Sequence, residues 1–308
     1  MGHEMNLLSN KKVPPSDRAW RHVLWNIAGQ LVMGMAIYFL VVRLISSPIP
    51  DLRYMDLDLV IGALFLNLVM LLLMSLGWTC ALHAVGVPMS LRSGFALYYR
   101  VSILRYIPGS IWNFPGRAYL CQQRGIPLTT FTKSAFFELY FLLTIAGALA
   151  GWGISIYLGN PGLLLLSSVT TGVLLLAIIL LFPRFSALLR KILGLARAET
   201  LSSRPMAAMI VIYAAVWISY GVAMAFLLLA LPGTPSFNPL FVIPMSTTAW
   251  VAGFLSPSPV GIGVRELCFS VMLGSGFESA VVVASLIQRV LELGLEGVLW
   301  LVAQVSDI

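Results

Sequence analysis

Charged residues are scarce in this sequence. Asp, Glu, Lys and Arg make up 10% of the 308 residues, against roughly a quarter in soluble domains. Apolar residues supply 59% of the chain, and its mean hydropathy is +0.93. This amount of charge is too small to form the surface of a water-soluble protein. The composition therefore predicts an all-α integral membrane protein. It also leaves no stretch of the chain for a soluble catalytic domain.

Metal-binding, redox and nucleotide-binding motifs are lacking. The three cysteines (Cys80, Cys121 and Cys268) form no CxxC pair, and the three histidines are equally scattered. We therefore expect no disulfide framework, no metal site and no cofactor. No GxxxxGK[ST] loop occurs, so we expect transport, if any, to be passive or driven by protons or membrane potential.

The net charge of +7 does not predict a nucleic-acid partner, because the basic residues lie in joints between apolar stretches. Lys and Arg number four in 1–22, six in 92–133 and five in 183–204. The positive-inside rule places these three segments in the cytoplasm. Residues 1–22 are polar and precede an apolar run too long for a signal peptide. They predict a cytoplasmic N-terminus.

Six apolar stretches are long enough to span a bilayer, which takes about 20 helical residues. We predict spans at 23–45, 57–81, 134–157, 162–182, 206–230 and 279–304. Two further stretches, 92–125 and 238–275, are interrupted by Pro and Gly. Loop charge predicts that each is a re-entrant hairpin, the first open to the cytoplasm and the second to the outside. The second could instead cross the bilayer.

These assignments predict one membrane domain, 1–308, with an inverted repeat. Repeat A is 57–157 and repeat B is 206–304, each consisting of a span, a hairpin and a span. The break follows the start of the repeat by 51 residues in one case (57 to 108) and by 53 in the other (206 to 259). Inverted repeats around broken helices are a recurring plan in transporters.

The two interruptions predict the functional site, because backbone groups freed by a break at membrane depth must face protein or a wet cavity. The predicted break residues are Pro108, Gly109, Pro115, Gly116, Pro259, Gly261 and Gly263. Arg117 and Arg265 each follow a break. A guanidinium beside a half-helix N-terminus suits a phosphate, although either arginine could simply anchor at the headgroup region. Glu266 needs a partner, for which Arg105 and Arg117 are candidates.

The last predicted span carries the most polar side chains. Gln288, Glu292 and Glu296 step by four residues, and Arg289 lies three before Glu292. Their common face should avoid lipid. It forms either a structural Arg289–Glu292 pair or the lining of a cavity in which Glu292 or Glu296 exchanges protons. Glu138 follows Pro108 by 30 residues, as Arg289 follows Pro259, so these two could also face each other.

Two segments resemble a known family. RYIPGSIWNFPGRAYLCQQRGI (105–126) is similar to the K/R-Y-x-P-G-x-x-W-x-x-x-G-R segment of the flippase-like, lysylphosphatidylglycerol synthase transmembrane-region family. SPSPVGIGVRE (256–266) resembles its later P-G-G-x-G-x-R-E segment, with Val260 where the family often has Gly. The matched positions are Arg105, Pro108, Gly109, Trp112, Gly116, Arg117, Pro259, Gly261, Gly263, Arg265 and Glu266, and Arg289 fits the arginine of the last span.

The resemblance implies a lipid translocase in a bacterial or archaeal cytoplasmic membrane. Family members join such a membrane module to an aminoacyltransferase, or occur alone in envelope pathways. This sequence ends soon after its last predicted span, so we expect the module without the transferase. Arg117, Arg265 and Arg105 would bind an anionic lipid phosphate, and Glu138, Glu266, Gln288, Arg289, Glu292 and Glu296 would form a polar track. The alternatives are a membrane enzyme acting on a lipid phosphate or polyprenyl-linked glycan, and a non-transporting subunit of an envelope-synthesis complex. Envelope-biosynthesis partners or homo-oligomers are expected.

Overall fold

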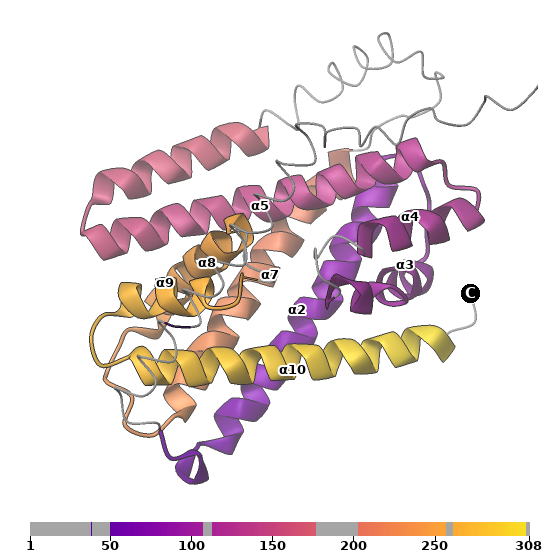
Figure 1. Cartoon of the computed structure of the whole chain (residues 1–308). Helices are drawn as coiled ribbons and strands as arrows, with labels where there is room; N and C mark the ends of the chain where they lie inside the picture. Colours follow the sequence, from indigo (N-terminus) through magenta and orange to yellow (C-terminus); the bar gives the residue numbers. More distant parts are fainter. Residues whose placement is uncertain (1–37, 39–49, 107–112, 177–202, 257–260, 306–308) are drawn as a thin grey trace, which may run out of the picture.

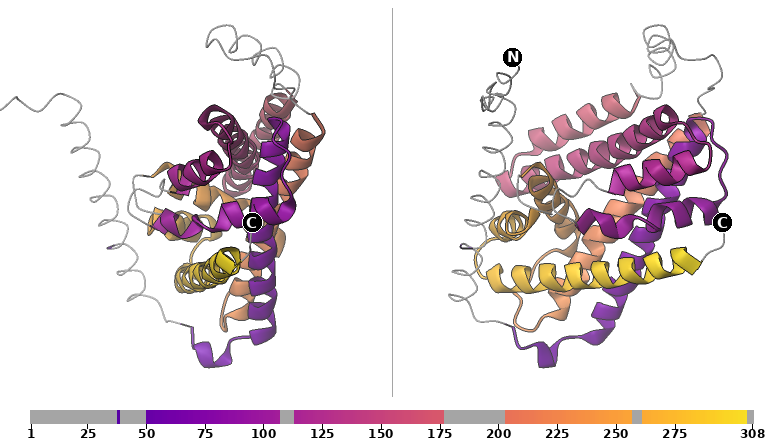
Figure 2. Two further views of the ribbon diagram at one scale, coloured as in Figure 1. Left: turned by 90° about the vertical axis from the view of Figure 1, so that its right-hand side faces the viewer. Right: turned by 45° about the vertical axis from the view of Figure 1, so that its right-hand side comes forward.

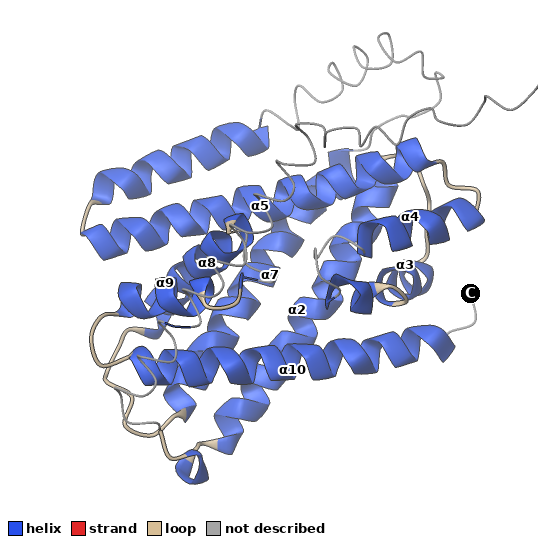
Figure 3. Cartoon of the chain, viewed as in Figure 1, coloured by secondary structure: helices blue, strands red, loops and turns tan. Residues whose placement is uncertain are grey.

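The computed structural model describes Tyr38 and residues 50–106, 113–176, 203–256 and 261–305. All regular secondary structure in this part of the chain is helical (Figure 3). The long helices are α2 (Leu57–Ala84), α5 (Leu128–Leu158), α7 (Ser203–Ala230) and α10 (Glu278–Val305). The shorter ones are η1 (Leu52–Tyr54), α3 (Leu91–Tyr99), η2 (Ser102–Tyr106), α4 (Asn113–Gln123), α8 (Pro239–Leu255), α9 (Val264–Leu273) and an apolar helix over Pro161–Leu176.

Three of these helices are long and apolar enough to cross a bilayer, namely α2, α5 and α7. They confirm the helices predicted at 57–81, 134–157 and 206–230. Helix α10 covers the predicted span 279–304, but its charged side chains keep it out of this apolar class. The stretch 23–45 lies outside the described residues apart from Tyr38, and 162–182 is described only to residue 176. The total of six spans therefore stays a prediction.

Local capping explains where the helices begin and end. The Asp56 carboxylate accepts hydrogen bonds from the backbone N–H groups of Asp58 and Leu59 at the start of α2. Asn238 caps α8 in the same way, and Pro239 occupies its first turn. Helix α5 ends at Gly159, which adopts a left-handed conformation at φ 61°. These residues confine the apolar runs to defined helices.

Helices α2 and α7 lie side by side and antiparallel. The backbone N–H of Asp56, just before α2, donates to the carbonyl of Ala230 at the end of α7, 3.0 Å away. Glycines permit the close approach: a Cβ on Gly77 would lie 2.7 Å from the Tyr213 ring. Small residues at helix contacts are typical of membrane proteins, where dispersion contacts must replace hydrophobic driving force.

The contacts within residues 57–158 have counterparts within 203–305. Helix α2 packs on α3 as α7 packs on α8, and α4 packs on α5 as α9 packs on α10. Across the halves, α5 contacts α8 and α10 contacts α3. Figures 1 and 2 show α5 and α10 on opposite sides of the interrupted segments, against a wall formed by α2 and α7. An internal repeat would produce this pattern; its sidedness in a membrane stays a prediction.

The first interruption differs from its predicted position, whereas the described part of the second agrees with it. Pro115 and Gly116 lie inside α4 rather than at a break, because the first turn of a helix tolerates proline. Pro108, Gly109 and Pro259 lie outside the described residues. In the second segment the break includes Gly261 and Gly263, with φ of 69° and 83°.

Candidate functional site

Six of the predicted charged residues form three ion pairs. Arg117 Nη1 lies 2.9 Å from Glu138 Oε2, Arg289 Nη2 lies 2.7 Å from Glu266 Oε1, and Arg105 Nη1 lies 2.7 Å from Glu296 Oε1. Each pair joins an interrupted segment to one of the long helices α5 and α10. The structure therefore brings the arginines and glutamates of the polar track together as pairs held between elements.

The Arg117–Glu138 pair is enclosed. The two side chains are 2% and 3% exposed, and aromatic rings surround the guanidinium: its carbon lies 4.7 Å from the centre of the Tyr98 ring, 5.2 Å from Trp78 and 5.0 Å from Phe114. Arg117 Nη1 and Glu138 Oε2 meet off the hydrogen-bond axis, so charge and ring faces hold the arginine. Arg117 thus already has a carboxylate partner inside this enclosure.

The Glu266–Arg289 pair lies at the second break and connects the start of α9 to α10. One oxygen of Glu266 accepts from Arg289, and the other accepts the backbone N–H of Gly263 at 2.7 Å. Glu266 thus supplies the anion for the N-terminus of α9, where the sequence predicted an external one. Its partner is Arg289, not Arg105 or Arg117 as the sequence suggested. Arg289 is 24% exposed, so this pair is more accessible than the first.

The Arg105–Glu296 pair fastens the first interrupted segment to α10. Arg105 lies in η2 and Glu296 in the second half of α10. Nearby, Arg100 Nε donates to the carbonyl of Ala303, and the Trp300 indole N–H donates to the carbonyl of Arg100. Arg105 and Arg100 thus both connect the first interrupted segment to α10.

Gln288 links α10 to α2. Its Nε2 donates to Asn67 Oδ1 at 2.9 Å and to Glu292 Oε1 at 3.1 Å. The structure thus gives Glu292 an amide partner instead of the Arg289 suggested by helical spacing. Glu138 and Arg289, which equal spacing suggested could face each other, belong to separate pairs. Differences in helix packing, which spacing along the chain does not record, account for both corrections.

Arg265 and Glu292 are the two predicted charged residues that take no part in these three ion pairs. Within the described residues neither makes an ion pair within 4.0 Å, and both line one small cavity of about 20 Å³. Arg265 lies over the Trp250 ring, 5.4 Å from its centre, and its buried Nε has no hydrogen-bond partner there. The other lining residues are Tyr220, Met224, Glu266, Ser285, Gln288 and Arg289. The cavity has room for about one water, and both positively and negatively charged side chains line it.

Comparison with known protein families matches residues 26–295 to the lysylphosphatidylglycerol synthase TM region. The match covers most of the chain and both interrupted segments. The chain belongs to this family. Its family and its apolar helices make it a multi-pass membrane protein, and the family connects it with membrane lipid metabolism or translocation. A search of curated proteins found no match.

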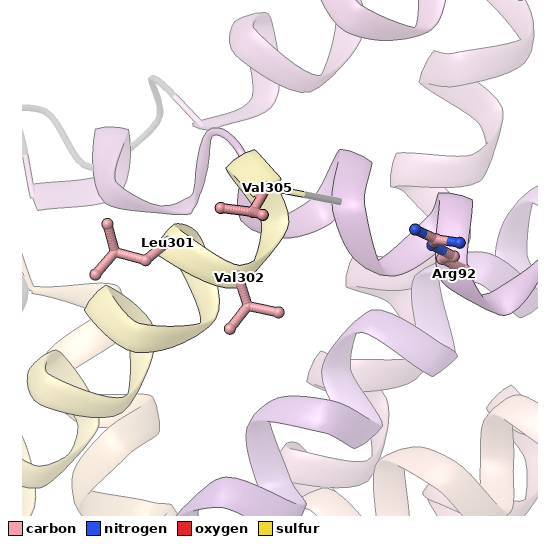
Figure 4. A pocket seen from close by; sticks show the side chains of 4 residues that line it. All are labelled: Arg92, Leu301, Val302 and Val305. Atoms are coloured by element: carbon pink, nitrogen blue, oxygen red, sulfur yellow. The ribbon is translucent and has the colours of Figure 1, made fainter. Parts of the chain in front are cut away.

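A larger hollow of about 460 Å³ lies elsewhere on this family member. Arg92 of α3 and Leu301, Val302 and Val305 of α10 line it, and Figure 4 shows the three apolar side chains along one end of α10. It contains none of the predicted site residues and has one polar side chain, whereas binding sites combine several convergent polar groups. We therefore take the smaller charged cavity as the candidate site. In the described residues no three His, Cys, Asp or Glu side chains are grouped to hold a metal.

Sequence reasoning missed several residues of this TM region. Asn67 interrupts an otherwise apolar stretch, and a polar side chain in such a stretch indicates a hydrogen-bond partner on a neighbouring helix. Tyr220 gave no comparable signal. The rings of Trp78, Tyr98 and Phe114 come from three separate elements, so no local motif reveals their cage around Arg117.

Proposed function

We propose that this protein translocates an anionic lipid across the cytoplasmic membrane, with the headgroup phosphate bound by Arg265. The family connection to membrane lipids supports the substrate class. The charged cavity beside the second break supports the location, because charge inside a membrane protein marks substrate or ion paths. The acyl tails would stay in the bilayer.

The observation that carries the proposal is the unpaired state of Arg265. Arg105, Arg117 and Arg289 each have a carboxylate within 2.9 Å. Arg265 has none among the described residues, and its Nε is buried without a hydrogen-bond partner. A phosphate oxygen would supply both the negative charge and the acceptor. We therefore favour Arg265 for phosphate binding over Arg117, which the sequence treated as its equal and which Glu138 already pairs.

The environment of Arg265 suits a lipid. Exposed apolar side chains flank the break: Leu255 is 75% exposed and Ile262 is 40% exposed. Tails could therefore lie against this surface while the headgroup enters. The cavity of about 20 Å³ admits about one water, and a phosphate is larger. Headgroup entry consequently requires α9 and α10 to separate around Arg265.

The test is lipid movement in vesicles. The full chain is reconstituted into phosphatidylcholine–phosphatidylglycerol vesicles carrying a fluorescent phosphatidylglycerol or polyprenyl phosphate, and dithionite bleaching reports the leaflet of the probe. We expect Arg265→Gln to slow movement about ten- to hundredfold, the effect of losing one charge-assisted contact of about 1.5–3 kcal/mol.

The control is Arg204→Gln, which removes an equal charge from an exposed position near the start of α7. It should move lipid at the wild-type rate. Unchanged movement in Arg265→Gln would overturn the phosphate-binding role. No movement in the wild-type protein would overturn translocation, and a covalently altered probe would instead indicate a membrane enzyme.

A further inference from the structure

Among the glutamates of the predicted polar track, all of which the structure describes, Glu292 is the one without an ion pair to a described residue. Glu138, Glu266 and Glu296 each lie within 2.9 Å of an arginine. Glu292 has no cation within 4.0 Å among the described residues, and its recorded hydrogen bond comes from the neutral amide of Gln288. It shares its cavity with Arg265, the arginine assigned above to the lipid phosphate.

Charges face Glu292 from two helices and a titratable phenol faces it from a third. Helix α9 contributes Arg265 and Glu266, α7 contributes Tyr220, and α10 itself contributes Gln288, Arg289 and Glu296. Glu266 and Arg289 neutralise each other. Among the residues that line the cavity, Arg265 is therefore the cation that balances Glu292.

A bound phosphate would disturb this balance. Arg265, Arg289, Glu266 and Glu292, which all line the cavity, sum to zero charge. A phosphodiester headgroup brings one negative charge, and it would bind the same guanidinium that faces Glu292. Two anions at one site favour protonation of one of them. Since a phosphodiester resists protonation at neutral pH, the carboxylate is the group that takes the proton.

We propose that Glu292 carries one proton with each anionic headgroup that Arg265 binds. The proton leaves water on the side where the lipid enters, bonds to a Glu292 carboxylate oxygen, and returns to water when the phosphate leaves on the other side. Gln288 serves both states, because an amide can donate to a carboxylate and accept from a carboxylic acid. Its buried Oε1 lacks a hydrogen-bond partner in the described residues and is available for the second role.

This inference rests on the proposed lipid translocation and adds its driving force. The loaded site is neutral, so coupled movement transfers no net charge. A difference of one pH unit should then shift the leaflet ratio of a fluorescent phosphatidylglycerol about tenfold at equilibrium. A potassium–valinomycin potential without a pH difference should leave that ratio unchanged.

The deciding variant is Glu292→Gln, which mimics the protonated side chain permanently. It should still move lipid, but without the proton the movement carries charge. Its leaflet ratio should therefore respond to the membrane potential and lose its response to pH. Asp58→Asn removes a carboxylate from an exposed position near the start of α2, and its ratio should respond as the wild-type ratio does. Protein-free vesicles give the background.

The outcomes separate the two proposals. No lipid movement in any protein would overturn translocation itself. Movement in the wild-type protein that follows the potential and ignores pH would overturn the proton coupling alone. The same conclusion would follow if Glu292→Gln kept the wild-type response to pH.

Discussion

The two halves of the molecule each hold an ion pair between the helix after the interruption and the long helix that follows, but the charges are exchanged. In the first half the arginine, Arg117, lies on α4 and its glutamate lies on α5. In the second half the glutamate, Glu266, lies on α9 and its arginine lies on α10. The first pair is enclosed by three aromatic rings. The second borders a cavity, and its arginine is 24% exposed.

The difference indicates a division of labour between two similar frameworks. A buried pair costs desolvation and holds its elements only while both partners remain. The enclosed Arg117–Glu138 pair therefore fixes how α4 packs on α5 in the first half. The second pair has one partner accessible and lies next to Arg265 and Glu292. That half has the charges that headgroup binding requires, beside a small cavity that would have to widen to admit a phosphate.

The substitution with the largest expected effect is one that breaks the enclosed Arg117–Glu138 pair. Glu138→Gln leaves Arg117 charged and 2% exposed, so we expect a loss of about 3–5 kcal/mol in free energy of unfolding. Thermal unfolding of the full chain in detergent measures it. The double variant Arg117→Gln, Glu138→Gln should be less destabilised than Glu138→Gln alone, because no buried charge is left without a partner. Losses that simply add would show that the pair does not act as a unit.

The accessible pair should respond differently to the matching substitution. Glu266→Gln keeps an acceptor for the Gly263 N–H but loses the charge that holds Arg289. Because Arg289 reaches solvent, we expect a stability loss of only about 1–2 kcal/mol, with slower lipid movement in vesicles. A stability loss equal to that of Glu138→Gln, with normal lipid movement, would contradict the proposed division between the halves.

Sequence was sufficient to locate the three long apolar helices, but not to predict how the charged residues pair. The apolar runs located α2, α5 and α7 because a span must be continuous and apolar. The partners of Glu138 and Arg289 depend on which helices pack together. Equal spacing from two prolines suggested that these two residues meet, whereas each pairs within its own half.

Likeness of motif also concealed a difference. Arg117 and Arg265 follow similar Pro- and Gly-rich letters, and sequence treats them as equivalent. In the structure the counterpart of Arg117, as the residue paired to the following long helix, is Glu266. Glu266, which is paired, and Arg265, which has no ion-pair partner among the described residues, are neighbours in sequence and lie about 100° apart around the helix. Only packing distinguishes the two.

The smallest expected effects come from alanine substitutions of one glycine in each half. Gly261 has φ of 69°, and a Cβ there would lie 2.8 Å from the backbone of Gly253. We expect Gly261→Ala to cost about 1–2 kcal/mol in unfolding free energy. Gly116 lies inside α4, and its nearest obstacle is the tip of the Leu104 side chain at 2.9 Å. Gly116→Ala should be nearly neutral, because alanine favours the helix by about 0.5–1 kcal/mol and offsets the contact.

These two substitutions also test where movement occurs. If α9 separates from α10 to admit a headgroup, a stiffer turn at Gly261 should slow lipid movement in vesicles by more than its effect on stability explains. Gly116→Ala should leave the rate unchanged, since the first half stays closed around Arg117. Equal slowing by both variants would mean that the two interruptions open together, and the enclosed pair would then have to part during each transfer.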